Sequence, residues 1–332
     1  MRLGPLSISP PLFMAPMAGF TDWAFRALVR GYGGCGLPAA EMVSARGMAE
    51  IIARSDRIPP RVWGVAEEAR PLAVQIWHND PALLADVGAI LVHRFGVSVV
   101  DLNFGCPVKA VREKAESGSY LLDHPERIGR IVAQVASACA PVPVTAKIRL
   151  GTSEKRITAA ETAQAVEEAR GAAVAVHGRT ASQLYRGRAD WNQIAAVKPF
   201  LRRIPLIGNG DIRTPQDAAN AFRDFSVDGV MVGRGALGRP WLFREIQSHL
   251  AGEPVRYPTP YDPREAVLEH FRLTALQHDP IRAVVLMRKT ACRYGHGRPG
   301  ARRFRAELAT VTTEAGFREA VARLFREEQA VE

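Results

Sequence analysis

Eight short runs of apolar and β-branched residues recur along the first two thirds of this 332-residue chain, about 30 residues apart, the length of a strand–helix–strand unit. Each run is continuously apolar rather than alternating, which is typical of parallel strands buried on both faces. The eight runs are Leu12–Ala15, Ala39–Val43, Leu72–Ile76, Val97–Leu102, Pro143–Ile148, Ala173–Val176, Pro205–Ile207 and Gly229–Val232.

Segments with helical spacing of apolar residues separate these runs. The clearest are Pro81–His93, Pro125–Cys139, Thr158–Ala169 and Pro215–Phe222. Alternation of this kind, repeated eight times, predicts an α/β fold of the (β/α)8 TIM barrel type. A doubly wound open sheet is the alternative that the same pattern allows.

The pattern changes after residue 253. A proline-rich stretch around Tyr257–Pro260 predicts a linker, and the rest of the chain has helical spacing without a strand-like run. We therefore predict two domains. Residues 1–253 form the barrel, and residues 262–332 form a smaller C-terminal all-α helical domain.

Composition narrows the class of protein further. The chain has 44 Lys and Arg against 34 Asp and Glu, and its four cysteines lack CxxC spacing or a neighbouring histidine cluster. This predicts no metal site and favours a reducing compartment. Prolines interrupt the N-terminus, and His93 and Arg94 interrupt the longest apolar stretch, so we expect a cytoplasmic protein without membrane contact. We also expect a monomer.

A basic segment lies in the predicted helical domain. From Ile281 to Arg305 the chain carries eight Lys and Arg residues and no acidic residue, with Tyr294, His296 and Phe304 interleaved. Such a segment predicts contact with a polyphosphate backbone, with aromatic groups available for stacking. A solvated basic helix face is the alternative.

Polar residues follow most of the predicted strands. Because the carboxyl ends of all strands in a barrel meet at one face, these residues are predicted to surround a single site. One such residue alone could simply cap the next helix. The strand-end residues are Pro16–Gly19, Glu41, Gln75, Asp101, Asn103, Lys147, Arg149, His177, Arg179, Asn209–Asp211, Gly233 and Arg234.

The most specific segment is VVDLNFGCP, residues 99–107. It ends a predicted strand and places Cys106 between Gly105 and Pro107, in the kind of loop that is usually exposed. A thiol with an ordinary pKa of about 8.5 is mostly protonated at neutral pH. Cys106 could therefore donate a proton or, if activated, act as a nucleophile. Buried packing is the alternative for a lone cysteine.

Six motifs together resemble the tRNA-dihydrouridine synthases, and GRPWLFREI is most similar to the bacterial B type. The resemblance covers residues 12 to 250 and weakens beyond 260. The motifs are APMAGFTD (15–22), DLNFGCP (101–107), KIRLG (147–151), VHGRT (176–180), GNGDI (208–212) and VGRGALGRPWLF (232–243).

The resemblance implies an FMN-dependent barrel followed by a helical tRNA-binding domain. In this family NADPH, or NADH, reduces the flavin, and a hydride then passes to C6 of a uracil in tRNA. Cys106 matches the catalytic cysteine that supplies a proton to C5. Arg298, Arg302 and Arg303 are then expected to contact tRNA phosphates.

The resemblance also implies the cofactor contacts. Pro16, Met17 and Ala18 match the segment that borders the isoalloxazine ring. Gln75 matches a glutamine at the polar edge of the flavin, and Lys147 matches a lysine near N1 and O2, where negative charge gathers on reduction.

Three further groups of residues match positions of the family's site. His177 matches a histidine of that site, and Asn103 and Arg179 resemble contacts of the target uracil. The loops after the last two strands are expected to hold the FMN phosphate. Their residues are Asn209, Gly210, Asp211, Gly233 and Arg234.

Two other functions compete with this hypothesis. A flavin barrel acting on a free pyrimidine or another small molecule would share the cofactor, but it would have little use for the basic segment. An RNA-binding protein whose barrel has lost catalysis would share the basic segment, but it would have no reason to keep both Cys106 and Lys147. The acidic residues Glu113 and Glu116 in the loop after Cys106 leave the choice of uridine open.

Overall fold

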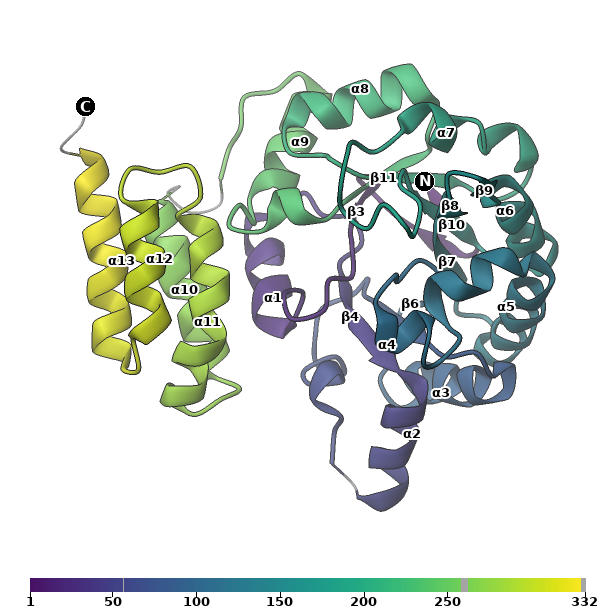
Figure 1. Ribbon diagram of the computed structural model, residues 1–332, viewed down its shortest axis with the longest axis horizontal. Coiled ribbons are helices and arrows are strands. Elements are labelled where there is room, and N and C mark those ends of the chain that lie inside the picture. The colour runs from purple at the N-terminus through teal and green to yellow at the C-terminus, as the bar shows by residue number, and fades with distance from the viewer. Residues whose placement is uncertain (56, 258–261, 330–332) are drawn as a thin grey trace. The chain divides into compact units, whose positions relative to one another are not determined.

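The computed structural model describes residues 1–55, 57–257 and 262–329, and its centre is one eight-stranded sheet whose neighbouring strands are all parallel (Figure 1). Every predicted run overlaps one of these strands, so the predicted barrel is confirmed. The strands are β3 (Leu12–Met14), β4 (Ala39–Ser44), β5 (Ala73–Trp77), β6 (Val99–Asn103), β7 (Val144–Arg149), β10 (Ala173–His177), β11 (Leu206–Asn209) and β12 (Gly229–Val232).

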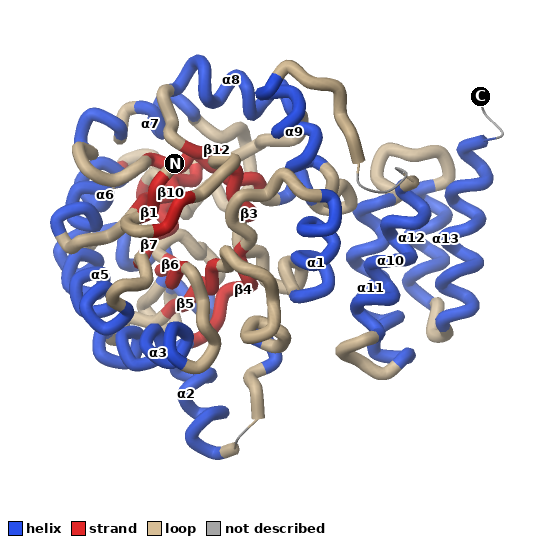
Figure 2. Tube along the Cα trace, turned by 180° about the vertical axis from the view of Figure 1, so that it is seen from behind, coloured by secondary structure: helices blue, strands red, loops and turns tan. Residues whose placement is uncertain are grey.

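The sheet closes between β3 and the segment that leads into β4. These two strands end the pairing order, and a parallel bridge joins Phe13 to Leu37. Met14 N–H donates to the Leu37 carbonyl at 3.0 Å, and Leu37 N–H donates to the Leu12 carbonyl at 3.2 Å. Figure 2 shows the strands gathered at the centre, with helices around them. The open-sheet alternative is therefore wrong.

Helices connect the strands in the order expected of a barrel. Two of them, α3 and α5, have the predicted bounds, and both begin with proline, whose missing N–H costs nothing at that position. Asp80 caps α3 by accepting from Ala82 N–H at 2.9 Å. Besides α1 (Trp23–Tyr32), which follows β3, the helices between strands are α2 (Ala45–Arg54), α3 (Pro81–His93), α4 (Lys109–Arg112), α5 (Pro125–Cys139), α6 (Ala159–Glu168), α7 (Trp191–Ala195) and α8 (Pro215–Phe225).

Two small antiparallel hairpins accompany the barrel: β1 (Arg2–Leu3) with β2 (Leu6–Ser7), and β8 (Gly151–Ser153) with β9 (Arg156–Ile157). Leu3 and Ile8 are fully buried in a cluster with residues from the amino ends of the strands, such as Ala73 and Val99. The N-terminal segment therefore packs against the amino end of the barrel.

The contacts divide the chain into two units, residues 1–23 with 35–233 and residues 24–34 with 234–332. The second unit is helical, in agreement with the predicted fold class. It contains most of α1 (Trp23–Tyr32), then α9 (Leu242–Ala251), α10 (Pro263–Ala275), α11 (Pro280–Tyr294), α12 (Ala301–Thr310) and α13 (Glu314–Gln329).

The first and last helices of the barrel pattern thus pack with the C-terminal helices. Phe25 on α1 and His270 on α10, for example, have ring centroids 5.7 Å apart. The boundary between residues 253 and 262 stays a prediction, and residues 258–260 of the predicted linker lie outside the described residues. In the described part of the chain, no helix has the length and apolar character needed to cross a membrane.

Candidate active site

Hydrogen bonds join polar side chains at the carboxyl ends of β5 and β6. Gln75 lies opposite Asp101 in the strand register, and its Nε2 donates to Asp101 Oδ2 at 2.6 Å. Asn103, two residues further along β6, donates from Nδ2 to Gln75 Oε1 at 2.7 Å. All three side chains are buried. The structure therefore brings the predicted residues Gln75 and Asn103 into direct contact.

The loop that carries Cys106 is held from several sides. Asn103 Oδ1 accepts hydrogen bonds from the backbone N–H groups of Gly105 at 3.1 Å and Cys106 at 2.9 Å. Arg149, at the end of β7, donates from Nε to the Gly105 carbonyl at 2.9 Å. The Cys106 carbonyl accepts from Ser119 N–H at 3.0 Å. These bonds fix the backbone on both sides of the thiol.

The Cys106 thiol is partly buried. Burial raises its pKa above the ordinary value, and three groups offset only part of that effect: the Val108 backbone N–H, Arg149 and Lys147. A thiol with a raised pKa is protonated at pH 7. Of the two roles open to Cys106, the structure favours the proton donor over the thiolate nucleophile.

Lys147 lies on β7, opposite Asn103 in the register. Burial and the Arg149 guanidinium together lower the pKa of its ammonium to about 8, against the attraction of Asp101 and Cys106, which raises it. Among the described residues, none accepts a hydrogen bond from Lys147 Nζ. Lys147 is therefore a largely protonated cation at pH 7 whose donors are available to a bound group.

Arg179 is buried, and its guanidinium group makes an ion pair and hydrogen bonds within the protein. Nη2 pairs with Asp211 Oδ2 at 2.6 Å, and Nη1 lies 3.3 Å from His177 Nε2. Nε donates to the Arg186 carbonyl at 3.0 Å, and Nη2 donates to the Gly187 carbonyl at 2.7 Å. These bonds tie the loop after β10 to the end of β11. They favour a positioning role for Arg179 over direct contact with a base.

The turn after β11 contains Asn209, Gly210 and Asp211. Asn209 Nδ2 donates to the Met231 carbonyl on β12 at 2.8 Å. Gly210 has φ +137°, and a Cβ there would lie 2.5 Å from Ala189 Cβ, so this position requires glycine. Asp211 Oδ2 also accepts from Ala189 N–H at 2.8 Å. The turn is therefore held in one shape.

The segment Pro16–Ala18 follows β3 and forms a turn in which Met17 N–H donates to Thr21 Oγ1 at 2.9 Å. Gly233, at the end of β12, lies beside it, since a Cβ on Gly233 would be 3.7 Å from the Met17 sulfur. Arg234 follows Gly233 in the chain but belongs to the second unit, as do Arg298, Arg302 and Arg303.

Three buried charged residues at strand ends have no individual role in the prediction from sequence. Asp101 accepts from Gln75, and Arg149 holds the Cys106 loop. Glu41 accepts from Gly19 N–H, on the turn after β3, and from Arg61 Nη1 at 2.9 Å. Their position after a strand was the available signal. What sequence could not show is that each is buried and connected to a predicted site residue.

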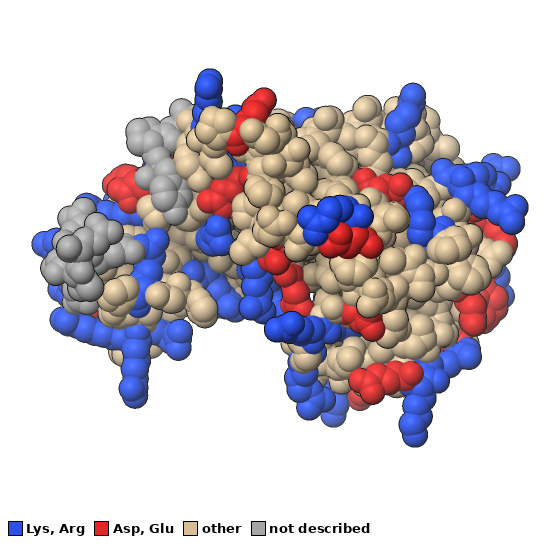
Figure 3. Space-filling model, turned by 90° about the horizontal axis from the view of Figure 1, so that it is seen from above, with Lys and Arg blue, Asp and Glu red and all other residues tan. Residues whose placement is uncertain are grey.

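The basic segment lies on α11, α12 and their connection. Arg302 and Arg303 are exposed. Arg298 is partly buried, and its guanidinium carbon lies 4.8 Å from the centroid of the Phe325 ring. Figure 3 shows Lys and Arg side chains (blue) on the surface of the C-terminal helices, at the left.

The prediction that aromatic residues of this segment are available for stacking is wrong for Tyr294 and Phe304. Each side chain is only 3% exposed, because it packs inside the helical unit. The Tyr294 hydroxyl lies 3.0 Å from His270 Nδ1, and Phe304 packs against Gly295. Of the three interleaved aromatic residues, His296 is the exposed one.

A family model and the curated relatives of this chain agree on one family. A family model described as Dihydrouridine synthase (Dus) matches residues 13–329. Over 339 aligned residues the chain is 36% identical to a tRNA-dihydrouridine synthase B from Pseudomonas aeruginosa, covering 99% of this chain and 97% of the relative. Over 273 residues it is 40% identical to a tRNA-dihydrouridine synthase B from Yersinia pestis, covering 82% of each.

The fold also resembles a solved structure. The old yellow enzyme from Trypanosoma cruzi superimposes with a TM-score of 0.54 at 11% identity, covering 84% of this chain and 96% of that one. An identity this low supports the barrel fold alone.

Proposed function

The chain belongs to the dihydrouridine synthase family, and from this premise we propose that it reduces the C5–C6 double bond of uridines in tRNA to give dihydrouridine. One observation in the structure supports the chemistry most directly. The protonated Cys106 thiol lies on a fixed loop at the carboxyl ends of the strands, next to the strand that carries the Lys147 cation. A proton donor and a site for developing negative charge are what this reduction requires.

The donor set at the barrel mouth fits FMN. Lys147 offers an ammonium without a protein acceptor among the described residues, suited to the N1 and O2 edge of the ring. Gln75 and the Pro16–Ala18 turn would border the ring, with His177 nearby. Asn209, Gly210, Asp211 and Gly233 would hold the phosphate. The chemistry that bound FMN supplies is delivery of a hydride to uracil C6 after its own reduction by NADPH.

The chain's residues then account for the other half of the reaction. Hydride addition at C6 leaves negative charge on C5 and O4 of the uracil, and Cys106 protonates C5. A neutral thiol suits this role because it brings no fixed charge to the base. Asn103 would contact the uracil, while Arg179 would shape the mouth through the loop at residues 186–187. We propose that the enzyme acts as a cytoplasmic monomer and needs no metal.

The test of the whole proposal is made on purified protein. We expect a yellow preparation with an FMN spectrum that NADPH bleaches, and dihydrouridine formed in unmodified tRNA in the presence of EDTA. NADH replaces NADPH in a parallel reaction. A protein that cannot bind FMN would exclude this function. Reduction of free uracil or orotate, but not of tRNA, would favour the small-molecule flavoenzyme instead.

Replacing Arg298, Arg302 and Arg303 together by glutamine is expected to weaken tRNA binding and to flatten its salt dependence. Each phosphate contact that is lost should lower the slope of log K against log salt by about one unit. Binding is measured by fluorescence anisotropy at several salt concentrations.

A matched control removes the same charge elsewhere. Arg94, Arg170 and Arg202 are exposed and precede strands, so they lie at the amino end of the barrel, away from the strand ends that form the site. Their triple replacement by glutamine should change the slope much less. Equal loss in both variants would show that only net charge matters, and unchanged binding in the first would assign its three arginines to a solvated face.

A further inference from the structure

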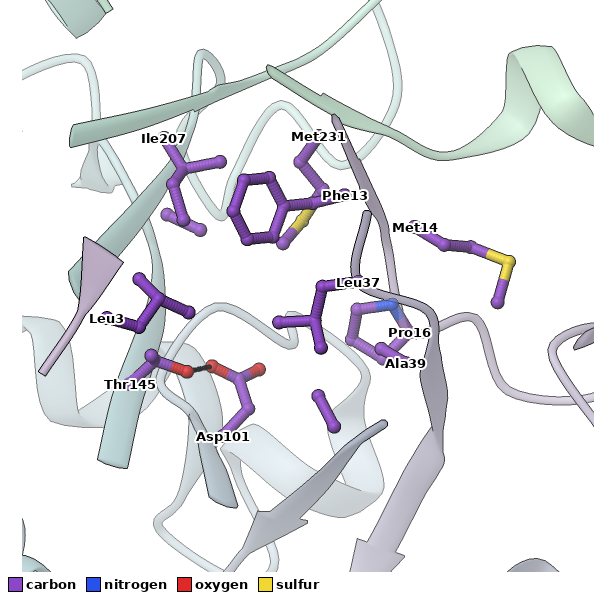
Figure 4. Close-up of a pocket in the computed structure, with 12 residues that line it drawn as sticks. Leu3, Phe13, Met14, Pro16, Leu37, Ala39, Asp101, Thr145, Ile207 and Met231 are labelled. Atoms are coloured by element: carbon purple, nitrogen blue, oxygen red, sulfur yellow. Dashed lines mark hydrogen bonds between the residues drawn. The ribbon is translucent and has the colours of Figure 1, made fainter. Parts of the chain in front are cut away.

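Asp101 is a buried carboxylate inside the barrel. Oδ1 accepts from Thr145 Oγ1 at 2.6 Å, and Oδ2 accepts from Gln75 Nε2 at 2.6 Å. Figure 4 shows the carboxylate facing Thr145. Both residues line a cavity of about 20 Å³ whose other walls are mainly apolar, with Leu3 and Phe13 among them. The carboxylate therefore depends largely on these two donors for its stabilisation.

In this series of side chains, the direction of one hydrogen bond determines the direction of the next. An ionised carboxylate only accepts hydrogen bonds, so Gln75 must turn its NH2 group toward Asp101. Gln75 Oε1 then faces Asn103, which must present its own NH2 group. Asn103 Oδ1 is left to face the backbone N–H groups of Gly105 and Cys106, as observed.

We propose that Asp101 is a positioning residue for Cys106, because it sets the orientation of two carboxamides in sequence and so supplies the acceptor that anchors the Cys106 loop. The role in positioning follows from the hydrogen bonds themselves; its consequence for turnover rests on the proposed function. Asp101 bonds to Thr145 and Gln75, and it acts on the Cys106 loop through Gln75 and Asn103.

The negative charge of the Asp101 carboxylate, and not only its shape, determines the direction of these hydrogen bonds. Burial raises the Asp101 pKa to about 6, while Thr145, Gln75 and the nearby Lys147 cation act against that rise. At pH 8 the group is therefore ionised and can only accept. An asparagine at position 101 could present either its oxygen or its NH2 group to Gln75. The second choice would reverse both carboxamides and place the Asn103 NH2 group against two N–H donors.

The experiment is amide hydrogen exchange of the flavin-loaded full-length Asp101→Asn variant at pH 8. We expect exchange at Gly105 and Cys106 to accelerate about tenfold or more, the loss that follows when a buried donor is deprived of its acceptor. Turnover on tRNA should show a larger change in kcat than in KM, since the two N–H groups of the Cys106 loop depend on Asn103 Oδ1, whereas the Asn103 contact with uracil is one of many contacts with tRNA.

Two further variants distinguish an effect of hydrogen-bond direction from a general loss of stability. Glu167→Gln removes another buried carboxylate, one that accepts from the N–H groups of Arg202, Arg203 and Ile204 before β11. It should lower stability and leave exchange at Gly105 and Cys106 unchanged. The double variant Asp101→Asn with Gln75→Glu puts the carboxylate one position along the chain, so Asn103 again faces an acceptor. It should restore the protection of both amides.

The proposal is overturned if Asp101→Asn keeps wild-type exchange at these amides, or if the Gln75→Glu change fails to restore it. If Asp101→Asn does not fold, hydrogen exchange of the wild-type protein provides the test. The side-chain NH2 protons of Gln75 and Asn103 should exchange slowly. Fast exchange of both would refute the assigned orientation. A protein that makes no dihydrouridine yet shows these exchange patterns would contradict the proposed function and leave this inference intact.

Discussion

Cys106→Ala is expected to lose nearly all dihydrouridine formation, by about 10³-fold, within the range that a single general acid contributes. The thiol is protonated because burial raises its pKa, and alanine offers no proton in its place. Its loop should keep its shape, since Asn103 Oδ1 and Arg149 Nε bond to backbone groups that alanine retains. Reduction of the bound flavin by NADPH should therefore remain largely intact. Single-turnover measurement of dihydrouridine, beside stopped-flow flavin reduction, gives both rates.

Two substitutions control for the loss of sulfur. Cys106→Ser keeps a hydroxyl that is a much weaker acid than a thiol, so its rate should remain far below that of the wild type. Cys292→Ala removes a partly buried thiol of the second unit and should leave turnover unchanged. Full turnover by Cys106→Ala under matched conditions would contradict the assigned role of the thiol. Equal loss of flavin reduction would point instead to a damaged cofactor site.

The barrel strands were predictable because each is buried on both faces. A strand in that setting is apolar along most of its length, as in the Ala173–Val176 part of β10, and the run is visible without knowledge of its neighbours. Helices with local start signals were equally clear, such as α3 with Asp80 as its cap and proline in its first turn. In both cases the deciding information lies within a few residues.

Elements held by distant contacts were not predicted. The β1–β2 hairpin has two residues per strand and so no periodic pattern; Leu3 is buried by residues from several barrel strands. Tyr294 illustrates the same limit in the helical unit, where an aromatic residue within a basic run proved to be a core residue bonded to His270. Burial of this kind depends on partners that lie far away in the sequence.

The candidate site shows the same division. Residue types that carry chemistry, such as Cys106 and Lys147, could be identified from their position after strands. The connection from Asp101 through Gln75 to Asn103 could not, because it depends on the register between β5 and β6. Sequence thus indicates which residues can act, and the structure shows which residues hold them in place.

Lys147→Met is expected to slow NADPH-driven reduction of the bound flavin by about 100-fold, the effect of removing one group that stabilises developing negative charge. The wild-type rate should also depend on pH. Burial lowers the Lys147 pKa to about 8, so the ammonium is present below pH 8 and is lost as the pH rises through that value. The reduction rate should therefore fall above pH 8 in the wild type, and this fall should be absent in the methionine variant.

Two controls make the interpretation specific to the charge at this position. Lys147→Arg keeps a cation at every accessible pH, so it should retain part of the rate without the decline above pH 8. Lys155→Met removes an exposed ammonium from the β8–β9 hairpin and should preserve both the rate and its pH dependence. Rates are compared per bound FMN, because weaker cofactor binding alone would mimic a slower step. A methionine variant with the wild-type rate and the wild-type decline above pH 8 would show that another group controls the reduction.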